Sequence, residues 1–405
     1  MMSLKQHSVR TNNENLLGRQ KKLDAPKTHT IQRPILGEVE KNTFQTSITT
    51  KKAASQNVDS KKPVANHKTL TTKSTALQNV NIKKKTASKY QLNTNKLPEP
   101  KITVTHVDDD ENLDNQLIAE IDKKDRGDVF LVPEYVQDIF HYLCKYEQNC
   151  IIRKNYLASH KSTPRMRSVL VNWIVEVHES FKMTLETLHM SVAILDRYLQ
   201  LNNNIGKQNL QLVGITSILI AAKYEEMYLP PLTDFAEISD NFFSCADIKK
   251  MELDVLSTLG FKLGRPLSLQ FLRRYNKIGN VSPEHHYLAK YLLEIFLLQY
   301  ELCHVNPSLQ AAAACCLSLS ILNEVSDPRI VWTKTLVCCS SYKYVDIKST
   351  VINLAYYLHK IESSKFLAIK EKYSKTSNRK ISKHAQLKGP LITKLVHQYH
   401  QKVSD

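Results

Sequence analysis

The chain has 405 residues, 42% of them hydrophobic, and a formal net charge of +17, which allows two folded domains beside a disordered segment. No apolar run reaches the roughly 18–20 residues that a membrane span needs, which argues against a membrane protein. The eight cysteines form no C-x-x-C pair, and no apolar secretory segment precedes them. These features favour a soluble protein in a reducing compartment.

The first part of the chain is basic and poor in large apolar residues. Residues 1–100 hold 19 Lys and Arg against 6 Asp and Glu, and their only aromatic residues are Phe44 and Tyr90. Such a segment buries too little apolar area to offset the entropy of ordering it. The charge turns acidic over residues 101–130. We predict a disordered regulatory tail over 1–130, in which Lys83-Lys84-Lys85 is either an import signal or a solvated lysine run.

Beyond residue 130 the pattern is helical almost throughout. Apolar residues recur at helical spacing, and prolines stand at the starts of segments rather than inside them. The helix over 209–222 is rich in small residues that let neighbouring helices approach closely, so we expect it at the centre of a bundle. The helices predicted in this part of the chain cover 133–146, 166–176, 184–199, 209–222 and 247–259.

A second copy of this pattern follows about 99 residues later. Leu210-Gln211, before a helix of small residues, recurs as Leu309-Gln310 before another. The 184–199 helix is matched by 287–298, and the 166–176 helix by one that starts near Pro266. We therefore predict an all-α fold of two tandem helical domains. The N-terminal helix and first domain cover 131–262, the second domain 263–385, and a C-terminal extension 386–405.

Motifs for catalysis and metal binding are absent from the sequence. Nine glycines leave little scope for phosphate-binding loops, and neither G-x-x-x-x-G-K nor G-x-G-x-x-G occurs. No H-E-x-x-H or C-x-x-C pair supplies metal ligands, and no serine stands in a G-x-S-x-G turn. We predict no catalytic residue, no cofactor and no metal site, and hence a binding protein rather than an enzyme.

The run Met166-Arg167-Ser168-Val169-Leu170-Val171-Asn172-Trp173 resembles the MRAIL-x-x-W signature of the cyclin box. Leu195-Asp196-Arg197-Tyr198-Leu199 and Ala222-Lys223-Tyr224-Glu225-Glu226 match further stretches at the family's spacing, and Phe271-Leu272-Arg273-Arg274 favours the B type. Residues 132–375 thus resemble the mitotic B-type cyclins. The resemblance implies two tandem cyclin-fold bundles.

The resemblance also implies a function. Such a protein is the regulatory subunit of a cyclin-dependent serine/threonine kinase, forms a heterodimer with it, and controls the G2/M transition in cytoplasm and nucleus. Lys223 and Glu252 match the polar pair that holds the kinase's mobile helix in its working position. A surface salt bridge worth at most about 1 kcal/mol is the competing interpretation of that pair. The family's further apolar kinase contacts correspond to Tyr135, Ile139, Phe261 and Leu263. The alternative for these four residues is a role in the core.

A second surface is implied for substrates. An apolar groove for a leucine beside a carboxylate for an arginine would capture Arg-x-Leu motifs. We expect Val169 and Ile174 in the core, and an internal pair between Arg167 and Asp196. The residues that match the family's exposed docking patch are Met166, Leu170, Trp173, Glu176 and Gln211.

The tail contains a candidate degradation signal. Arg33-Pro34-Ile35-Leu36 resembles the R-x-x-L destruction box that the anaphase-promoting ubiquitin ligase reads, with Arg33 and Leu36 as its defining residues. The alternative function is a helical scaffold or a transcription-type cyclin adaptor whose basic tail touches nucleic acid. We expect no direct nucleic-acid binding and no membrane contact.

Overall fold

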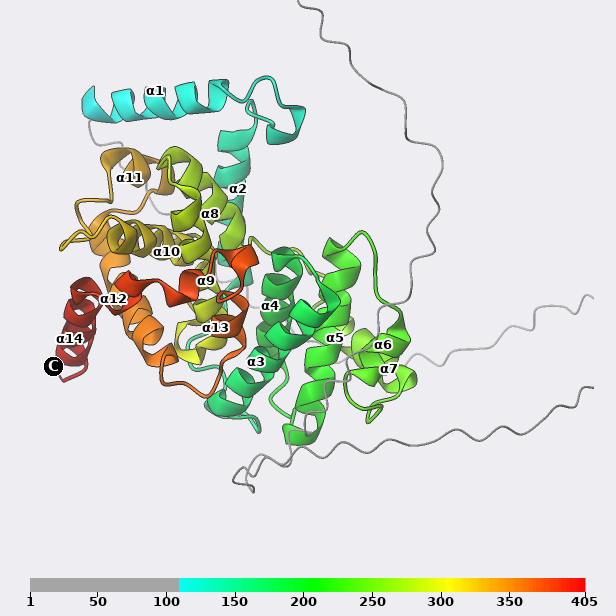
Figure 1. Cartoon of the computed structure of the whole chain (residues 1–405). Helices are drawn as coiled ribbons and strands as arrows, with labels where there is room; N and C mark the ends of the chain where they lie inside the picture. Colours follow the sequence, from blue (N-terminus) through cyan, green and yellow to red (C-terminus); the bar gives the residue numbers. More distant parts are fainter. Residues whose placement is uncertain (1–108, 405) are drawn as a thin grey trace, which may run out of the picture. The chain divides into compact units, whose positions relative to one another are not determined.

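The computed structural model describes residues 109–404 (Figure 1), and no strand occurs among them. The predicted all-α class and the two tandem bundles are confirmed. No helix in this range is both long and apolar enough to span a membrane. The candidate signals at Arg33, Leu36 and 83–85 lie outside the described residues.

The first bundle surrounds helix α5. Thr163 caps α3 by accepting a hydrogen bond from the Met166 amide, and Pro164 occupies the first turn, where its missing N–H is harmless. The side chains of α5 are buried from Leu210 to Ala222, as expected for a central helix. The helices of this bundle are α3 (Pro164–Phe181), α4 (Leu185–Leu201), α5 (Lys207–Glu225), α6 (Leu232–Glu237) and α7 (Cys245–Thr258).

The second bundle repeats this arrangement around α10. Its central helix is buried from Gln310 to Ile321. The offset of 99 residues extends beyond the predicted elements, because α7 begins at Cys245 and α12 at Tyr344. The helices are α8 (Ser268–Ile278), α9 (Pro283–Leu298), α10 (Pro307–Leu322), α11 (Lys334–Ser340), α12 (Tyr344–Ile361) and α13 (Ala368–Lys372).

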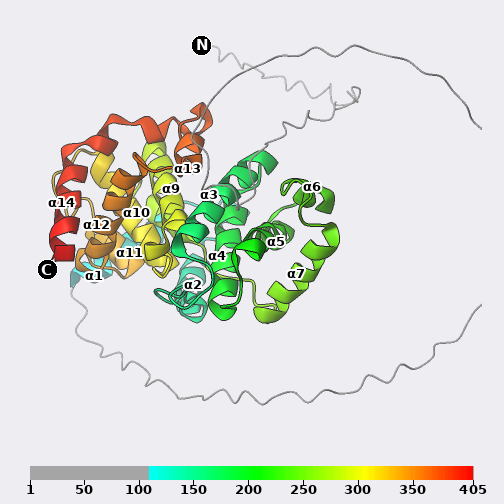
Figure 2. The same ribbon diagram turned by 90° about the horizontal axis from the view of Figure 1, so that it is seen from below.

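Helix α14 (Pro390–Ser404) completes the second bundle by packing on α12. The rings of Tyr356 and Tyr399 stack with centroids 3.8 Å apart. Ile392 and Leu395 are 1% and 2% exposed. The segment predicted as a C-terminal extension is therefore part of the folded domain. Figures 1 and 2 show α14 and α7 at opposite ends of the two-bundle body.

Helix α1 (Asp109–Lys123) corrects the predicted tail, which was drawn to residue 130. Ile118 is 3% exposed, and the buried Asp122 pairs with Arg274 of α8. Lys277 forms an ion pair with Asp125 just beyond the helix. An acidic amphipathic segment becomes ordered here because the second bundle supplies both an apolar surface and two cations.

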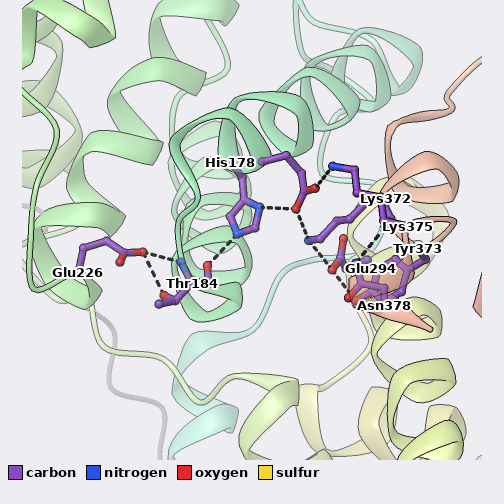
Figure 3. Close-up of polar contacts among 9 residues, drawn as sticks. His178, Thr184, Glu226, Glu294, Lys372, Tyr373, Lys375 and Asn378 are labelled. Atoms are coloured by element: carbon purple, nitrogen blue, oxygen red, sulfur yellow. Dashed lines mark hydrogen bonds and ion pairs between the residues drawn. The ribbon is translucent and has the colours of Figure 1, made fainter. Parts of the chain in front are cut away.

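Helix α13 and the residues that follow it connect the two bundles through one buried and one exposed ion pair (Figure 3). The Lys372 ammonium lies 2.7 Å from Oε1 of Glu294 in α9, and the Tyr373 hydroxyl donates to the same oxygen at 2.7 Å. Lys375 pairs at 2.6 Å with Glu179 of α3. Because these contacts reach α3 on one side and α9 on the other, they help to fix the relative position of the bundles.

Candidate functional site

Lys223 and Glu252 form an ion pair at one edge of the first bundle. Lys223 lies in the last turn of α5, and its Nζ is 2.6 Å from Oε1 of Glu252 in α7. The two side chains are 46% and 16% exposed. A pair this accessible contributes at most about 1 kcal/mol to stability. The other N–H groups of Lys223 and the second carboxylate oxygen of Glu252 can bind backbone groups of a partner.

Exposed apolar side chains occur on the same two helices and on the loop that follows α7. Tyr224 is 57% exposed, Leu253 63% and Phe261 66%. A side chain at Gly264 would lie 3.5 Å from the Tyr224 hydroxyl, which places the loop after α7 beside the end of α5. A polar pair flanked by large apolar side chains is typical of a protein-binding surface.

The loop that carries Phe261 is held in a fixed shape. Gly260 and Phe261 both have positive φ, +58° and +59°, and the Phe261 amide donates to the Leu256 carbonyl at 2.9 Å. This left-handed ending turns the chain away from α7. The Arg197 guanidinium then donates to the carbonyls of Lys262 at 2.5 Å and Leu263 at 3.2 Å. Phe261 is thus presented outward, whereas Leu263 is half-buried and packs on the core.

The N-terminal helix α2 (Val136–Glu147) presents a second apolar face. Tyr135, Ile139 and Tyr142 are 60%, 42% and 59% exposed, and their spacing places them on one side of the helix. The core role considered for Tyr135 and Ile139 is therefore wrong, as it is for Phe261.

The other side of α2 is anchored to the second bundle. Glu147 is buried and accepts hydrogen bonds from the amide and hydroxyl of Ser308, at 3.0 and 2.5 Å, at the start of α10. Burial raises the pKa of this carboxyl group, and the Ser308 hydrogen bonds oppose that rise. Phe140 meets Phe271 edge-on with centroids 6.0 Å apart. These contacts fix the direction in which Tyr135 and Ile139 point.

The predicted docking patch on α3 requires a correction. Leu170 is fully buried, because the absence of a side chain at Gly214 lets α3 and α5 approach; a Cβ there would lie 2.7 Å from Leu170 Cδ1. Gln211 is only 9% exposed. Val169, expected in the core, is instead half-exposed, whereas Ile174 is buried as predicted.

The apolar side chains that α3 does offer are Met166, Val169 and Trp173, which are all half-exposed. Their spacing places them on one side of the helix. Glu176, also half-exposed, lies near the end of this side and accepts a hydrogen bond from Asn172 at 3.0 Å. The geometry thus provides an apolar strip with a carboxylate at one end.

Arg167 and Asp196 form the predicted internal pair. The Arg167 Nε and Nη2 atoms donate to the two Asp196 carboxylate oxygens at 2.6 and 2.7 Å, and both residues are buried. Burial lowers the pKa of Arg167, but the Asp196 carboxylate more than offsets this, so the pKa lies well above its usual value. Nη1 also donates to the Leu297 carbonyl of α9 at 3.0 Å. The pair therefore joins both bundles as well as α3 and α4.

No cluster of three or more His, Cys, Asp and Glu side chains suited to a metal occurs within 109–404. A cavity at the seam of the bundles, lined in part by His189 and Arg265, holds about 40 Å³, which is room for water alone. Burial lowers the pKa of His189 to about 3, so this histidine is neutral.

Four residues that form or support the proposed kinase surface were not predicted as site residues. Tyr142 belongs to the apolar face expected for its helix, and Arg197 belongs to the Leu195–Leu199 motif. The sequence therefore contained a pattern that could have identified both. Tyr224 and Leu253 adjoin Lys223 and Glu252 in the chain, but spacing alone does not separate exposed apolar residues from core residues.

Comparisons with known proteins agree with this architecture. The model of the cyclin N-terminal domain matches residues 138–264, and that of the cyclin C-terminal domain matches 266–387. The chain is 43% identical over 279 residues to the G2/mitotic-specific cyclin-B of Patella vulgata, covering 69% of this chain and 67% of that protein. It is 43% identical over 305 residues to the cyclin-B of Spisula solidissima, covering 74% and 70%. It is 40% identical over 280 residues to cyclin-B1 of Xenopus laevis, covering 69% of each.

Proposed function

The chain belongs to the cyclin family, among its G2/mitotic-specific B-type members, and is a regulatory subunit of a cyclin-dependent kinase; we propose that it activates the kinase through the surface around Lys223 and Glu252. The observation that carries this proposal is the accessible 2.6 Å ion pair beside Tyr224, Leu253 and Phe261. A pair of this kind adds little stability, so its placement among exposed apolar side chains is best explained by a partner.

The proposed mechanism is a shift between two kinase conformations. Lys223 offers N–H donors and Glu252 offers carboxylate acceptors, the groups needed to bind backbone carbonyls and amides at the end of a mobile helix. Tyr224, Leu253 and Phe261 bury apolar area when that helix packs against them. In this mechanism the surface around Lys223, Glu252 and Phe261 fits the kinase helix in one position only. Binding therefore favours the kinase conformation with an assembled active site. The cyclin itself contributes no catalytic atom.

The α3 surface is proposed to recruit substrates. Met166, Val169 and Trp173 offer an apolar strip for the leucine of an Arg-x-Leu motif, and Glu176 offers a carboxylate for its arginine. Leu170 supports this surface from beneath rather than touching the substrate, because it is fully buried. Trp173→Ala should weaken phosphorylation of substrates that carry the motif and leave short substrate peptides unaffected; equal effects on both would contradict the proposal.

Two further proposals concern the part of the chain outside the described residues. We propose that the Arg33-to-Leu36 motif directs destruction by the anaphase-promoting ubiquitin ligase and that the protein acts in both cytoplasm and nucleus. Arg33→Ala together with Leu36→Ala should lengthen the half-life at mitotic exit. An unchanged half-life would reject the motif, and imaging of a fluorescent fusion through the cell cycle tests the location.

The kinase surface is tested by replacing Lys223 and Glu252 together with alanine. Kinase affinity and histone phosphorylation by the reconstituted complex should fall by about thirtyfold or more, as expected when two central interface residues are lost.

The matched control replaces another partly exposed pair, Lys388 and Glu362, whose Nζ and Oε2 atoms lie 3.2 Å apart on the second bundle. Alanine at both of these positions should leave activation unchanged. Full activation by the Lys223 and Glu252 double variant would show that the kinase binds elsewhere.

A further inference from the structure

An open groove lies on the second bundle, far from the edge that carries Lys223. It runs between the first turns of α12, the turn at 326–329 and helix α14, and it encloses about 540 Å³. Figures 1 and 2 show α14 at the end of the body opposite α7. The proposed kinase surface and the α3 strip therefore leave this groove unused.

The floor of the groove is apolar. Leu391 and Leu395 of α14 are 9% and 2% exposed, and Tyr344 of α12, which lines the same groove, is half-buried. Burial raises the pKa of Tyr344 to about 12, so its phenol is neutral. Val345 also lines the groove and is 72% exposed. An apolar floor with an accessible valine at its side suits an apolar side chain of a ligand.

The rim of the groove is basic. Four cations line it, Arg329, Lys343, Lys348 and Lys394, against the single carboxylate of Asp327, which leaves a net charge of +3. The Asp327 carboxylate is already paired, since Arg329 Nε lies 2.7 Å from its Oδ2. The lysine side chains are exposed.

Two contacts fix the shape of the rim. Lys394 Nζ donates to the Ser326 carbonyl at 3.0 Å and joins α14 to the turn. The Arg329 amide donates to Asp327 Oδ1 at 3.0 Å within that turn. Lys394 and Arg329 are therefore held beside the apolar floor before any ligand arrives, which reduces the entropy lost on binding.

We propose that this groove binds an acidic peptide segment of a partner protein. One apolar side chain of the peptide packs on Tyr344 and Leu391, and its Asp and Glu side chains contact Lys343, Lys348 and Lys394. Charge complementarity selects an acidic occupant, since the rim carries three unneutralised positive charges. The apolar floor selects a peptide with a hydrophobic anchor over a small anion, which would leave that floor in water.

The test uses the full-length chain bound to its kinase and a short fluorescein-labelled peptide with one leucine between runs of Glu and Asp. Fluorescence anisotropy should show binding that weakens as salt is added, because the contacts are exposed charge pairs. Replacing the peptide carboxylates by glutamine amides, or its leucine by alanine, should each weaken binding. Hydrogen exchange should slow at residues 343–348 and 391–398 when the peptide is present.

The groove variant is Lys343→Glu with Lys348→Glu, which should lower peptide affinity about tenfold or more. Both positions are exposed, and a carboxylate at 343 interacts favourably with the dipole of α12, so the variant is expected to fold. Lys380→Glu with Lys383→Glu makes the same charge change at exposed positions elsewhere and should leave binding intact. Kinase activation should be normal in both variants.

Three results would overturn the proposal. Equal binding of the glutamine peptide would remove charge as the basis of recognition. Equal binding by the groove variant and the control variant would place the peptide elsewhere. A concentration-dependent increase in molecular mass that the groove variant abolishes would make a second copy of this chain the occupant.

Discussion

The corresponding edges of the two bundles are built from equivalent helices but differ in surface character. One is polar and accessible, whereas the other is apolar and buried. Applying the offset of 99 residues, Lys223 at the end of α5 corresponds to Leu322 at the end of α10, and Glu252 of α7 corresponds to Val351 of α12. Leu322 packs on the core and Val351 is fully buried. The polar pair thus has an apolar counterpart in the second bundle.

Helix α14 covers the neighbouring face of α12, whereas Val351 shares the core-facing side of that helix with Ile347 and Leu354. It lies along the face of α12 formed by Ser349, Ile352 and Tyr356, stacking on Tyr356 and donating from Lys402 to Ser349 at 2.6 Å. Ile352 is 6% exposed, whereas its counterpart in α7, Leu253, is 63% exposed. One edge is closed by the chain itself, and the equivalent edge stays open for a partner.

The largest expected effect comes from placing a carboxylate at the closed edge. Val351→Glu introduces an unpaired charge at a position with no exposure, and it should lower the free energy of unfolding by about 3–5 kcal/mol. The reciprocal change, Glu252→Val, should alter it by less than about 1 kcal/mol. Urea unfolding followed by circular dichroism measures both. Similar values for the two variants would refute the contrast between the edges.

The cover itself is tested by shortening a side chain of α14. Leu395 is 2% exposed, so Leu395→Ala should lower the free energy of unfolding by about 2–4 kcal/mol through lost burial and a new cavity. Leu253→Ala on the open edge removes the same atoms from an exposed site and should shift it by about 0.5 kcal/mol or less. A thermal scan compares them. A negligible shift for Leu395→Ala would mean that α14 does not stabilise the bundle.

Only a small effect on stability is expected when the open edge is given the residues of the closed one. Lys223→Leu with Glu252→Val should change the free energy of unfolding by less than about 1 kcal/mol, since only an accessible pair is lost. Kinase affinity, measured by calorimetry, should nevertheless fall strongly. Retained affinity would show that apolar contacts around Phe261 suffice and that the pair is dispensable.

Several features of the fold and the site could be predicted from the sequence. Helical spacing and proline positions located the bundle helices, because they depend on local periodicity. The shared offset of Leu210 and Leu309 revealed the repeat. The resemblance identified Lys223, Glu252 and the pair of Arg167 and Asp196, and the structure brings each of these pairs together.

The spacing of apolar residues could not predict which other segment of the chain packs against each helix face. Leu170 is buried because Gly214 on a different helix lets α3 and α5 approach, and Asp122 pairs with Arg274, 152 residues away. Local sequence thus determined the helices, their apolar faces and the repeat of the pattern. Only the packing of distant segments decided which of two similar edges is covered, because burial is set by the surface that arrives opposite a side chain.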